Sequence, residues 1–253
     1  MAKTESLTPA SIGGLPIQKV IEKSPTINVL VYGKPGTGKT VLAGSSSMVP
    51  EMSPVLLVDI EGGTNSLRTT YPDVDTVRVT TWPELLEICD YLADENNHYK
   101  TVVFDSLSEI QKLNMYYNMR KAGKNPMEEK ADWDDWGKNL ESMRFFVRAT
   151  RDLSINVIWT ALLDESQDKK TGKTMKVPYF TGKFKQEIAA IPDEVFFYYL
   201  KEDYDDEADE DVTLRILLTA STDDTVAKDR SGQLPQVIVS PTMQTLYEQM
   251  IGN

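Results

Sequence analysis

Short apolar runs alternate with longer segments of helical polarity from residue 27 onward. The first runs are nearly continuous Val, Ile and Leu, as in strands that are covered on both faces of a sheet. Strands that alternate with helices are typical of βαβ units and a mostly parallel sheet. The pattern predicts strands over Ile27–Tyr32, Val55–Asp59, Thr76–Val79, Thr101–Asp105, Ile155–Ala161, Val195–Leu200, Val212–Ala220 and Gln236–Val239.

Capping signals indicate where the intervening helices begin. Thr81 and Glu84 have the spacing of a capping box that opens a helix after the third strand. Ser106 and Glu109 repeat this spacing after the fourth strand. A longer helix is expected over residues 134–153, before the fifth strand.

The two ends of the chain differ from this central pattern. Residues 1–25 mix Ser, Thr, Pro and Gly with short apolar clusters, which predicts a flexible or oligomerising N-terminal arm. Near the other end, two predicted strands flank the acidic run 202–211 and are expected to pair as a hairpin. We therefore expect a single α/β domain over residues 26–253, with a mostly parallel central sheet, flanking helices and a C-terminal antiparallel extension.

The strongest chemical signal follows the first predicted strand. It matches the phosphate-binding pattern GxxxxGK[ST] and consists of Gly33, Lys34, Pro35, Gly36, Thr37, Gly38, Lys39 and Thr40, with Val41 next. Glycines let the backbone fold around phosphate oxygens and point its N–H groups at them. Lys39 is expected to reach the β- and γ-phosphates of ATP, and the Thr40 hydroxyl to bind Mg²⁺. The strand before the motif and the helix after it disfavour a chance glycine-rich turn.

Two acidic residues at strand ends could complete an ATPase site. Asp105 ends a buried strand predicted beside the P-loop strand and would hold Mg²⁺ as a Walker B acid, although a helix-capping Asp-Ser pair is the alternative. Because Ser106 follows Asp105, the group that polarises the attacking water must come from elsewhere. Glu61 lies just past the second strand, where strand ends line the ligand crevice. The alternative for Glu61 is an ordinary exposed loop residue.

The order P-loop, strand–Asp–x–Glu and strand–Asp–Ser resembles the RecA-like core over about residues 25–240. The chain is most similar to short phage-encoded RecA-core ATPases, described as nucleotide-binding or single-strand annealing and recombination proteins. The resemblance implies that Glu61 is the catalytic base. It also implies a homo-oligomer, ring or filament, in which Lys228 and Arg230 reach the γ-phosphate of a neighbouring subunit. The alternative for these two residues is a solvated basic turn.

A basic segment follows the strand predicted at 155–161. Residues 165–185 hold six lysines against two acids, with aromatic residues interleaved, a combination suited to single-stranded nucleic acid. The resemblance places a DNA-binding loop here, with Thr160 as a polar sensor at the strand end. The predicted DNA contacts are Lys169, Lys170, Lys173, Lys176, Tyr179, Phe180, Lys183 and Lys185. The alternative is an ordinary Lys-rich hairpin whose aromatic rings pack inward.

Charge and composition exclude several classes of protein. The net charge of −12 argues at first against nucleic acid, but eight acids lie in residues 202–211 alone, so the acidity is largely local. A single cysteine (Cys89) and a single histidine (His98) exclude a disulfide framework and a Cys/His zinc site. The longest apolar stretch, about nine residues, is too short to span a bilayer, and the N-terminus lacks the apolar core of a signal peptide. We expect a soluble cytoplasmic protein, in the host cytoplasm if phage-encoded.

These features favour an ATP-dependent, oligomeric RecA-like protein that binds single-stranded DNA and promotes annealing or recombination. Replication or single-strand-binding proteins are possible partners. The alternative, suggested by the net charge and the acidic run, is a P-loop switch or loader that engages a replication protein without gripping DNA itself. A small-molecule kinase ranks last because the sequence shows no Arg-rich lid.

Overall fold

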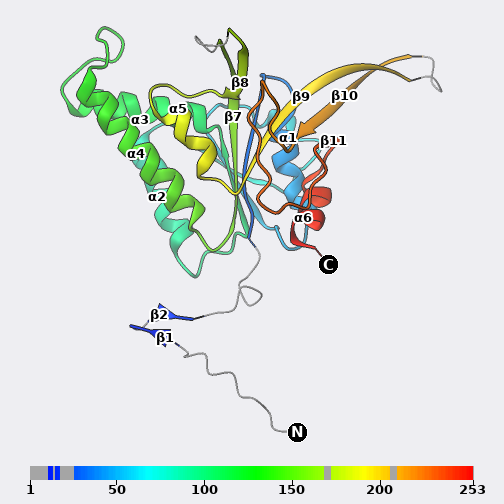
Figure 1. The fold of residues 1–253 in the computed structure, drawn as a ribbon. Helices are drawn as coiled ribbons and strands as arrows, with labels where there is room; N and C mark the ends of the chain where they lie inside the picture. The colour runs from blue at the N-terminus through cyan, green and yellow to red at the C-terminus, as the bar shows by residue number, and fades with distance from the viewer. Residues whose placement is uncertain (1–10, 14, 18–25, 168–171, 206–209, 253) are drawn as a thin grey trace.

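The computed structural model describes residues 11–13, 15–17, 26–167, 172–205 and 210–252. A central sheet runs through the molecule (Figure 1). Its strands are β3 (Asn28–Gly33), β4 (Val55–Asp59), β5 (Asp75–Arg78), β6 (Thr101–Asp105), β7 (Asn156–Gln167), β8 (Thr174–Pro178), β9 (Glu194–Asp205), β10 (Glu210–Leu218) and β11 (Val237–Val239). Two shorter strands, β1 (Ser11–Ile12) and β2 (Leu15–Pro16), pair separately.

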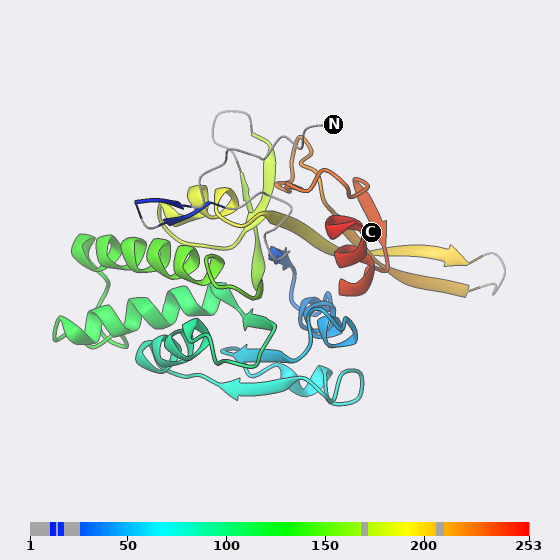
Figure 2. The same cartoon turned by 90° about the horizontal axis from the view of Figure 1, so that it is seen from below.

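The strand order is β11-β10-β9-β3-β7-β6-β4-β5, with β8 paired to β7. All neighbours from β9 to β5 run parallel, whereas β8, β10 and β11 pair antiparallel. Helices lie on both faces of this sheet (Figure 2). The predicted fold class, a mostly parallel sheet flanked by helices with an antiparallel extension, is therefore confirmed.

Each face of the sheet carries its own apolar core. One core packs the sheet against α2 (Trp82–Ala93), α3 (Leu107–Lys121) and α4 (Trp133–Arg151), and Phe104, Phe146 and Trp159 lie in it. The other packs against α1 (Lys39–Gly44) and α6 (Met243–Ile251), and includes Leu42, Phe196 and Leu246. Shorter helical segments are α5 (Phe184–Glu187), η2 (Ser45–Met48), η3 (Thr64–Ser66) and η4 (Ile188–Ala190). Among the described residues, no helix is both long and apolar enough to cross a membrane.

Two strands are longer than their apolar runs predict. The first half of β7 is buried, but from Leu162 onward its residues are half-buried or exposed, and from Leu163 onward it pairs only with β8. β9 likewise continues beyond Leu200 and pairs with β10 as the predicted hairpin. A run of apolar residues marks the part of a strand that is buried. The run therefore ends where the strand leaves the core, although the backbone hydrogen bonds to the next strand continue. The predicted N-terminal arm and the tips of both hairpins lie largely outside the described residues.

The strand order corrects one expectation. Asp105 ends β6, but β6 is not beside the P-loop strand, because β7 lies between β6 and β3. Sequence order alone does not reveal this insertion, since β7 follows both strands along the chain. The carboxyl ends of β3, β7, β6 and β4 nevertheless share one edge of the sheet, here called the P-loop edge.

Candidate nucleotide-binding site

The P-loop occupies the turn between β3 and α1. Gly36 and Gly38 have positive φ angles of 79° and 97°, a backbone region that favours glycine. At Gly33 a Cβ atom would lie 2.0 Å from the carbonyl oxygen of Tyr198 on β9. Two glycines thus permit the turn, and the third permits the close approach of β9.

Lys39 lies across the loop that precedes it. Its ammonium donates hydrogen bonds to the carbonyl oxygens of Gly33 and Lys34, each at 3.0 Å. Burial lowers the pKa of Lys39, and the nearby carboxylates of Glu61 and Asp105 oppose that shift. The cation is therefore held at the mouth of the loop by backbone carbonyls and is not locked in an ion pair.

Thr40 and Asp105 meet in spite of the intervening strand. The Thr40 hydroxyl donates to Oδ2 of Asp105 at 2.6 Å, and the hydroxyl of Thr160, from β7, donates to Oδ1. Asp105 is buried. The strand that separates β3 from β6 thus supplies a hydroxyl that orients the carboxylate.

These oxygens suit Mg²⁺. The ion prefers oxygen ligands and is commonly held by one or two protein groups together with waters and substrate phosphates. Within the described residues, no group of three or more His, Cys, Asp or Glu side chains forms a complete metal cage. A hydroxyl and a carboxylate at the phosphate loop fit a metal that arrives with a nucleotide.

Glu61 is anchored to the turn that contains Asp105. Its backbone amide donates to the Asp105 carbonyl at 3.2 Å, and its carboxylate accepts a hydrogen bond from the Ser106 hydroxyl. Desolvation of the carboxyl raises the pKa of Glu61, and the Ser106 hydrogen bond partly opposes that rise. Asp59 supports the same turn by accepting from the Gly62 amide at 2.6 Å. A carboxylate with a raised pKa beside the P-loop can accept a proton from water.

Ser106 differs from its predicted role. It does precede α3, but its side chain makes no capping hydrogen bond, so the predicted capping box with Glu109 is wrong. The tertiary contact with Glu61 takes the hydroxyl instead. At α2 the same spacing does form a capping box, between Thr81 and Glu84, because no acidic partner competes there.

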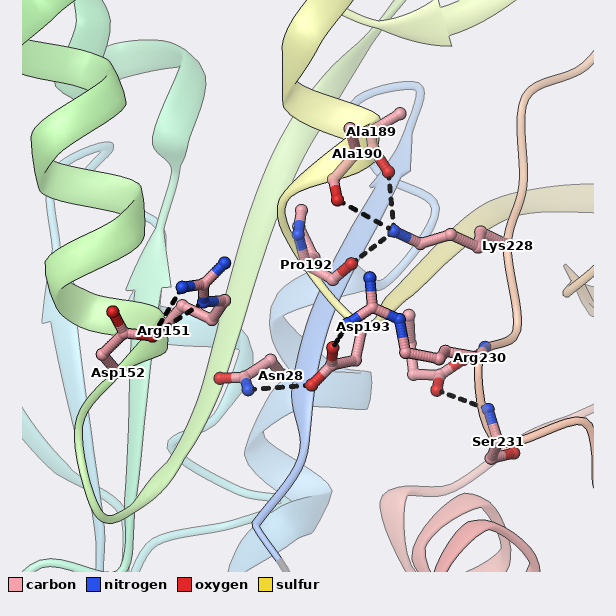
Figure 3. A network of polar contacts seen from close by, with 11 residues as sticks. Asn28, Arg151, Asp152, Ala189, Ala190, Pro192, Asp193, Lys228, Arg230 and Ser231 are labelled. Atoms are coloured by element: carbon pink, nitrogen blue, oxygen red, sulfur yellow. Dashed lines mark hydrogen bonds and ion pairs between the residues drawn. The ribbon is translucent and has the colours of Figure 1, made fainter. Parts of the chain in front are cut away.

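The structure does not bring Lys228 and Arg230 to the P-loop of their own chain. Arg230 pairs with Asp193, which also accepts from Asn28, the first residue of β3 (Figure 3). Lys228 donates to three backbone carbonyls, those of Ala189, Ala190 and Pro192. Because Asn28 and Gly33 are the two ends of β3, this cluster is roughly 17 Å from the P-loop at the opposite edge.

The predicted DNA segment divides into three parts. Lys169 and Lys170 lie outside the described residues. Lys173, Lys176 and Lys185 have carboxylate partners at 3.4, 2.7 and 2.5 Å, namely Asp223, Asp224 and Asp164. Lys183 is exposed and Tyr179 is half-buried.

Phe180 requires a correction. It is only 2% exposed and packs edge-to-face against the buried Phe184, with ring centroids 5.1 Å apart. A ring in that position cannot offer its face to a base, so the predicted stacking role of Phe180 is wrong. The alternation of Lys with aromatic residues arises because this segment returns to the core between its basic positions.

Three residues near the site gave no clear signal in the sequence. Ser108 and Gln111 lie on α3 just after Asp105 and hold the segment that contains Tyr179 and Thr181. Their only sequence signal is that polar residues recur on the buried face of a helix. Arg215, from β10, lies against Gly38, and nothing in the local pattern marks it.

Comparison with known proteins gives a matching family and likenesses among solved structures. A family described as an AAA domain matches residues 26–231. The crystal structure of the RadB recombinase matches with a TM-score of 0.45 and 16% identity, over 78% of this chain and 81% of that chain. No curated protein matches the sequence.

Proposed function

The chain belongs to this AAA domain family, and we propose that it is a RecA-like ATPase that binds single-stranded DNA and promotes annealing or recombination. The observation that supports this proposal most strongly is the convergence of four groups at the P-loop edge. Lys39, Thr40, Asp105 and Glu61 come from three separate segments, and hydrogen bonds or charge interactions connect them. Such a set serves phosphoryl transfer to water.

Each group has a distinct part in hydrolysis. The backbone N–H groups of residues 33–41 bind the phosphates, and Lys39 offsets the negative charge that they carry. Thr40 and Asp105 would hold Mg²⁺, which supplies charge neutralisation on the phosphates when bound. Glu61 accepts the proton of the attacking water, and its raised pKa makes it a better base than an ordinary glutamate.

Contacts from α3 connect the ATP site to the basic segment. The Ser108 hydroxyl donates to the Tyr179 carbonyl at 3.0 Å and accepts from the Leu162 amide at 3.1 Å. Gln111 holds Thr181 through three hydrogen bonds of 2.9 to 3.1 Å. Because Ser106, which directly precedes α3, touches Glu61, a change at the catalytic carboxylate has a short route to the predicted DNA contacts.

DNA binding would use the lysines of this segment. The partners of Lys173 and Lys176, Asp223 and Asp224, lie at the surface, where ion pairs contribute about 0–1 kcal/mol and can be exchanged for phosphates. The Lys185–Asp164 pair is half-buried. Lys183 is exposed, as Lys173 is, but has no ion pair within the described residues and so gives the clearest test. Lys183→Glu should weaken binding of single-stranded DNA and reduce its salt slope by about 1. Lys138→Glu, at an exposed lysine of α4, is the matched control.

The first experiment measures ATP hydrolysis with Mg²⁺ while single-stranded DNA is titrated in. We expect stimulation that disappears at high salt, and ATP-dependent annealing of complementary oligonucleotides. Gln111→Ala should leave the basal rate intact and abolish stimulation, whereas Gln244→Ala on α6 should change neither. If the protein shows neither ATP-dependent DNA binding nor annealing, the recombination function is refuted.

Assembly into a ring or filament is part of the proposal. Within one chain, Lys228 and Arg230 are too far from the P-loop to act, so a catalytic role requires a neighbouring subunit. Of the two, Arg230 has the more accessible side chain, with 59% of it exposed. Phage origin and location in a host cytoplasm are further predictions from the resemblance.

A second candidate function is a P-loop switch or loader for a replication protein. The acidic outer ends of β9 and β10, which project beyond the other strands of the sheet, favour it (Figure 1). Pull-down with replication proteins after nuclease treatment tests this alternative. Capture that depends on ATP, without DNA-stimulated hydrolysis, would support the loader over the recombination protein.

A further inference from the structure

Arg215 lies directly against the P-loop although it is far from it in sequence. Its Nε atom is 3.0 Å, and its Cδ atom 3.6 Å, from the position that a Cβ on Gly38 would occupy. Gly38 is the last loop residue before Lys39, where α1 begins. The guanidinium therefore lies beside the part of the loop whose N–H groups face the phosphates.

The position of Arg215 is fixed by the sheet. β10 pairs with β9 on one side and β11 on the other, and the Arg215 carbonyl accepts from the Ser240 amide at 2.7 Å. The ring of Tyr198, from β9, lies 3.8 Å from the same Cβ position. Burial raises the pKa of Tyr198 to about 12, and the Arg215 charge opposes the rise, which agrees with their proximity.

The guanidinium of Arg215 has no partner in the part of the chain that the structure describes. Arg78, Arg144, Arg151 and Arg230 all form ion pairs with carboxylates. Within the described residues, Arg215 forms neither an ion pair nor a side-chain hydrogen bond, in a chain with 39 acidic residues. Its side chain is also exposed. An unpaired arginine at a phosphate-binding loop is available for an anion that the loop holds.

We propose that Arg215 is a second cation of the nucleotide site, which binds the phosphate chain from the flank of the P-loop opposite Asp105 and acts within its own subunit. This inference rests on the proposed ATP-binding function. It adds a contact from β10, outside the segments that contain the P-loop, Glu61 and Asp105. Because it acts on phosphates that ADP and ATP share, it serves binding of both nucleotides.

The test compares affinities of wild type, Arg215→Ala and Arg215→Lys for Mg-ADP and for inorganic tripolyphosphate, measured by titration calorimetry. Loss of a charged hydrogen bond predicts a fall of about 10-fold or more for Arg215→Ala with both ligands. Arg215→Lys should recover part of the loss, because it keeps the charge without the fork of donors. Arg148→Ala, at an exposed arginine on α4, is the control and should bind as wild type does.

The outcomes separate this inference from the function on which it rests. If wild type fails to bind ADP, the proposed function is wrong, and Arg215 has no site to serve. If wild type binds and Arg215→Ala binds equally well, the phosphate contact is refuted. A loss for ADP without a loss for tripolyphosphate also overturns it, because the contact would then be to the nucleoside. Thermal unfolding of the ligand-free proteins shows that lost affinity does not reflect lost folding.

Discussion

The two edges of the sheet gather similar residues and use them differently. At the P-loop edge, the charge of Asp105 acts on both Lys39 and Glu61, which also act on each other, yet no ion pair joins the three. At the opposite edge lies an amino-edge cluster, defined as Asn28, Asp193, Glu194, Lys228 and Arg230. There, Arg230 pairs with Asp193, Lys228 binds three carbonyls, and Glu194 accepts from two backbone amides.

The difference lies in how completely each charge is matched. The amino-edge cluster ties the start of β9 to the segment 228–231 and leaves few groups for a ligand. Both edges hold a lysine on neutral carbonyls, but those that hold Lys39 belong to the phosphate-binding loop itself, so this cation can turn to a phosphate when one arrives. A carboxyl group with a raised pKa occurs at both edges, Glu61 at one and Glu194 at the other, but Glu61 lies beside a phosphate-binding loop, which marks its edge as the candidate functional site.

The largest effect is expected at the P-loop. Lys39→Ala removes the cation that faces the phosphates, so nucleotide affinity and turnover should both be lost. Equilibrium binding of a fluorescent ATP analogue measures the first, and phosphate release the second. Full affinity in this variant would mean that Lys39 does not face the phosphates and would break the comparison.

Glu61→Gln sharpens the comparison on the same edge. The amide still accepts a hydrogen bond from Ser106 but cannot take a proton from water. We expect ATP affinity within a few-fold of wild type and a turnover lower by about 10² to 10⁴. Single-turnover hydrolysis with Mg²⁺ measures the chemical step. An unchanged rate would place the base elsewhere.

At the amino edge the effects should fall on stability. Lys228→Ala leaves three carbonyl oxygens without their shared donor and should lower the free energy of unfolding by about 1–3 kcal/mol. Chemical denaturation measures this loss, with Lys138→Ala as an exposed control. Turnover per folded molecule should stay at the wild-type level. A large loss of turnover at full stability would give Lys228 a catalytic role.

The raised pKa of Glu194 predicts that the stability of the protein depends on pH. Burial, followed by the nearby Asp229, raises the pKa of Glu194 from 4.5 to about 7, while Lys228 and the amides of residues 230 and 231 oppose the rise. Between these two pH values the folded state holds a proton that the unfolded state has lost. This contribution to stability is complete below about pH 4.5 and is lost as the pH rises through about 7.

The measurement is the unfolding free energy of wild type and Glu194→Gln from pH 5 to 8. After allowance for solvent screening, wild type should lose roughly 1–2 kcal/mol more than the variant over this range. Parallel pH profiles would show that Glu194 does not titrate in this window.

The smallest stability effect is expected for Arg230→Ala, because its ion pair is largely exposed. The free energy of unfolding should change by less than about 1 kcal/mol. Turnover then decides the trans role. A loss that Glu61→Gln subunits restore in mixed assemblies would support Arg230 as a finger on the neighbouring site. Unchanged turnover would mean that Arg230 has only a structural role in the amino-edge cluster.

Much of the fold could be predicted because the signals are local. β4 and β6 have the predicted bounds, since both strands are buried along their whole length and their apolar runs have clear ends. The ends of β7 and β9 were missed because those strands leave the core before they end. Ser106 was misassigned because a capping pattern cannot show that Glu61 competes for the same hydroxyl.

The sequence by itself determined the P-loop, the succession of buried strands and the positions of Glu61 and Asp105 at strand ends. These depend on neighbours along the chain and on the period of burial. Only the tertiary structure decided that β7 separates β3 from β6, that Phe180 is buried, that Lys228 is held by carbonyls and that Arg215 reaches Gly38. Such contacts depend on which strands lie side by side, and the order of strands in a sheet differs from their order in the chain.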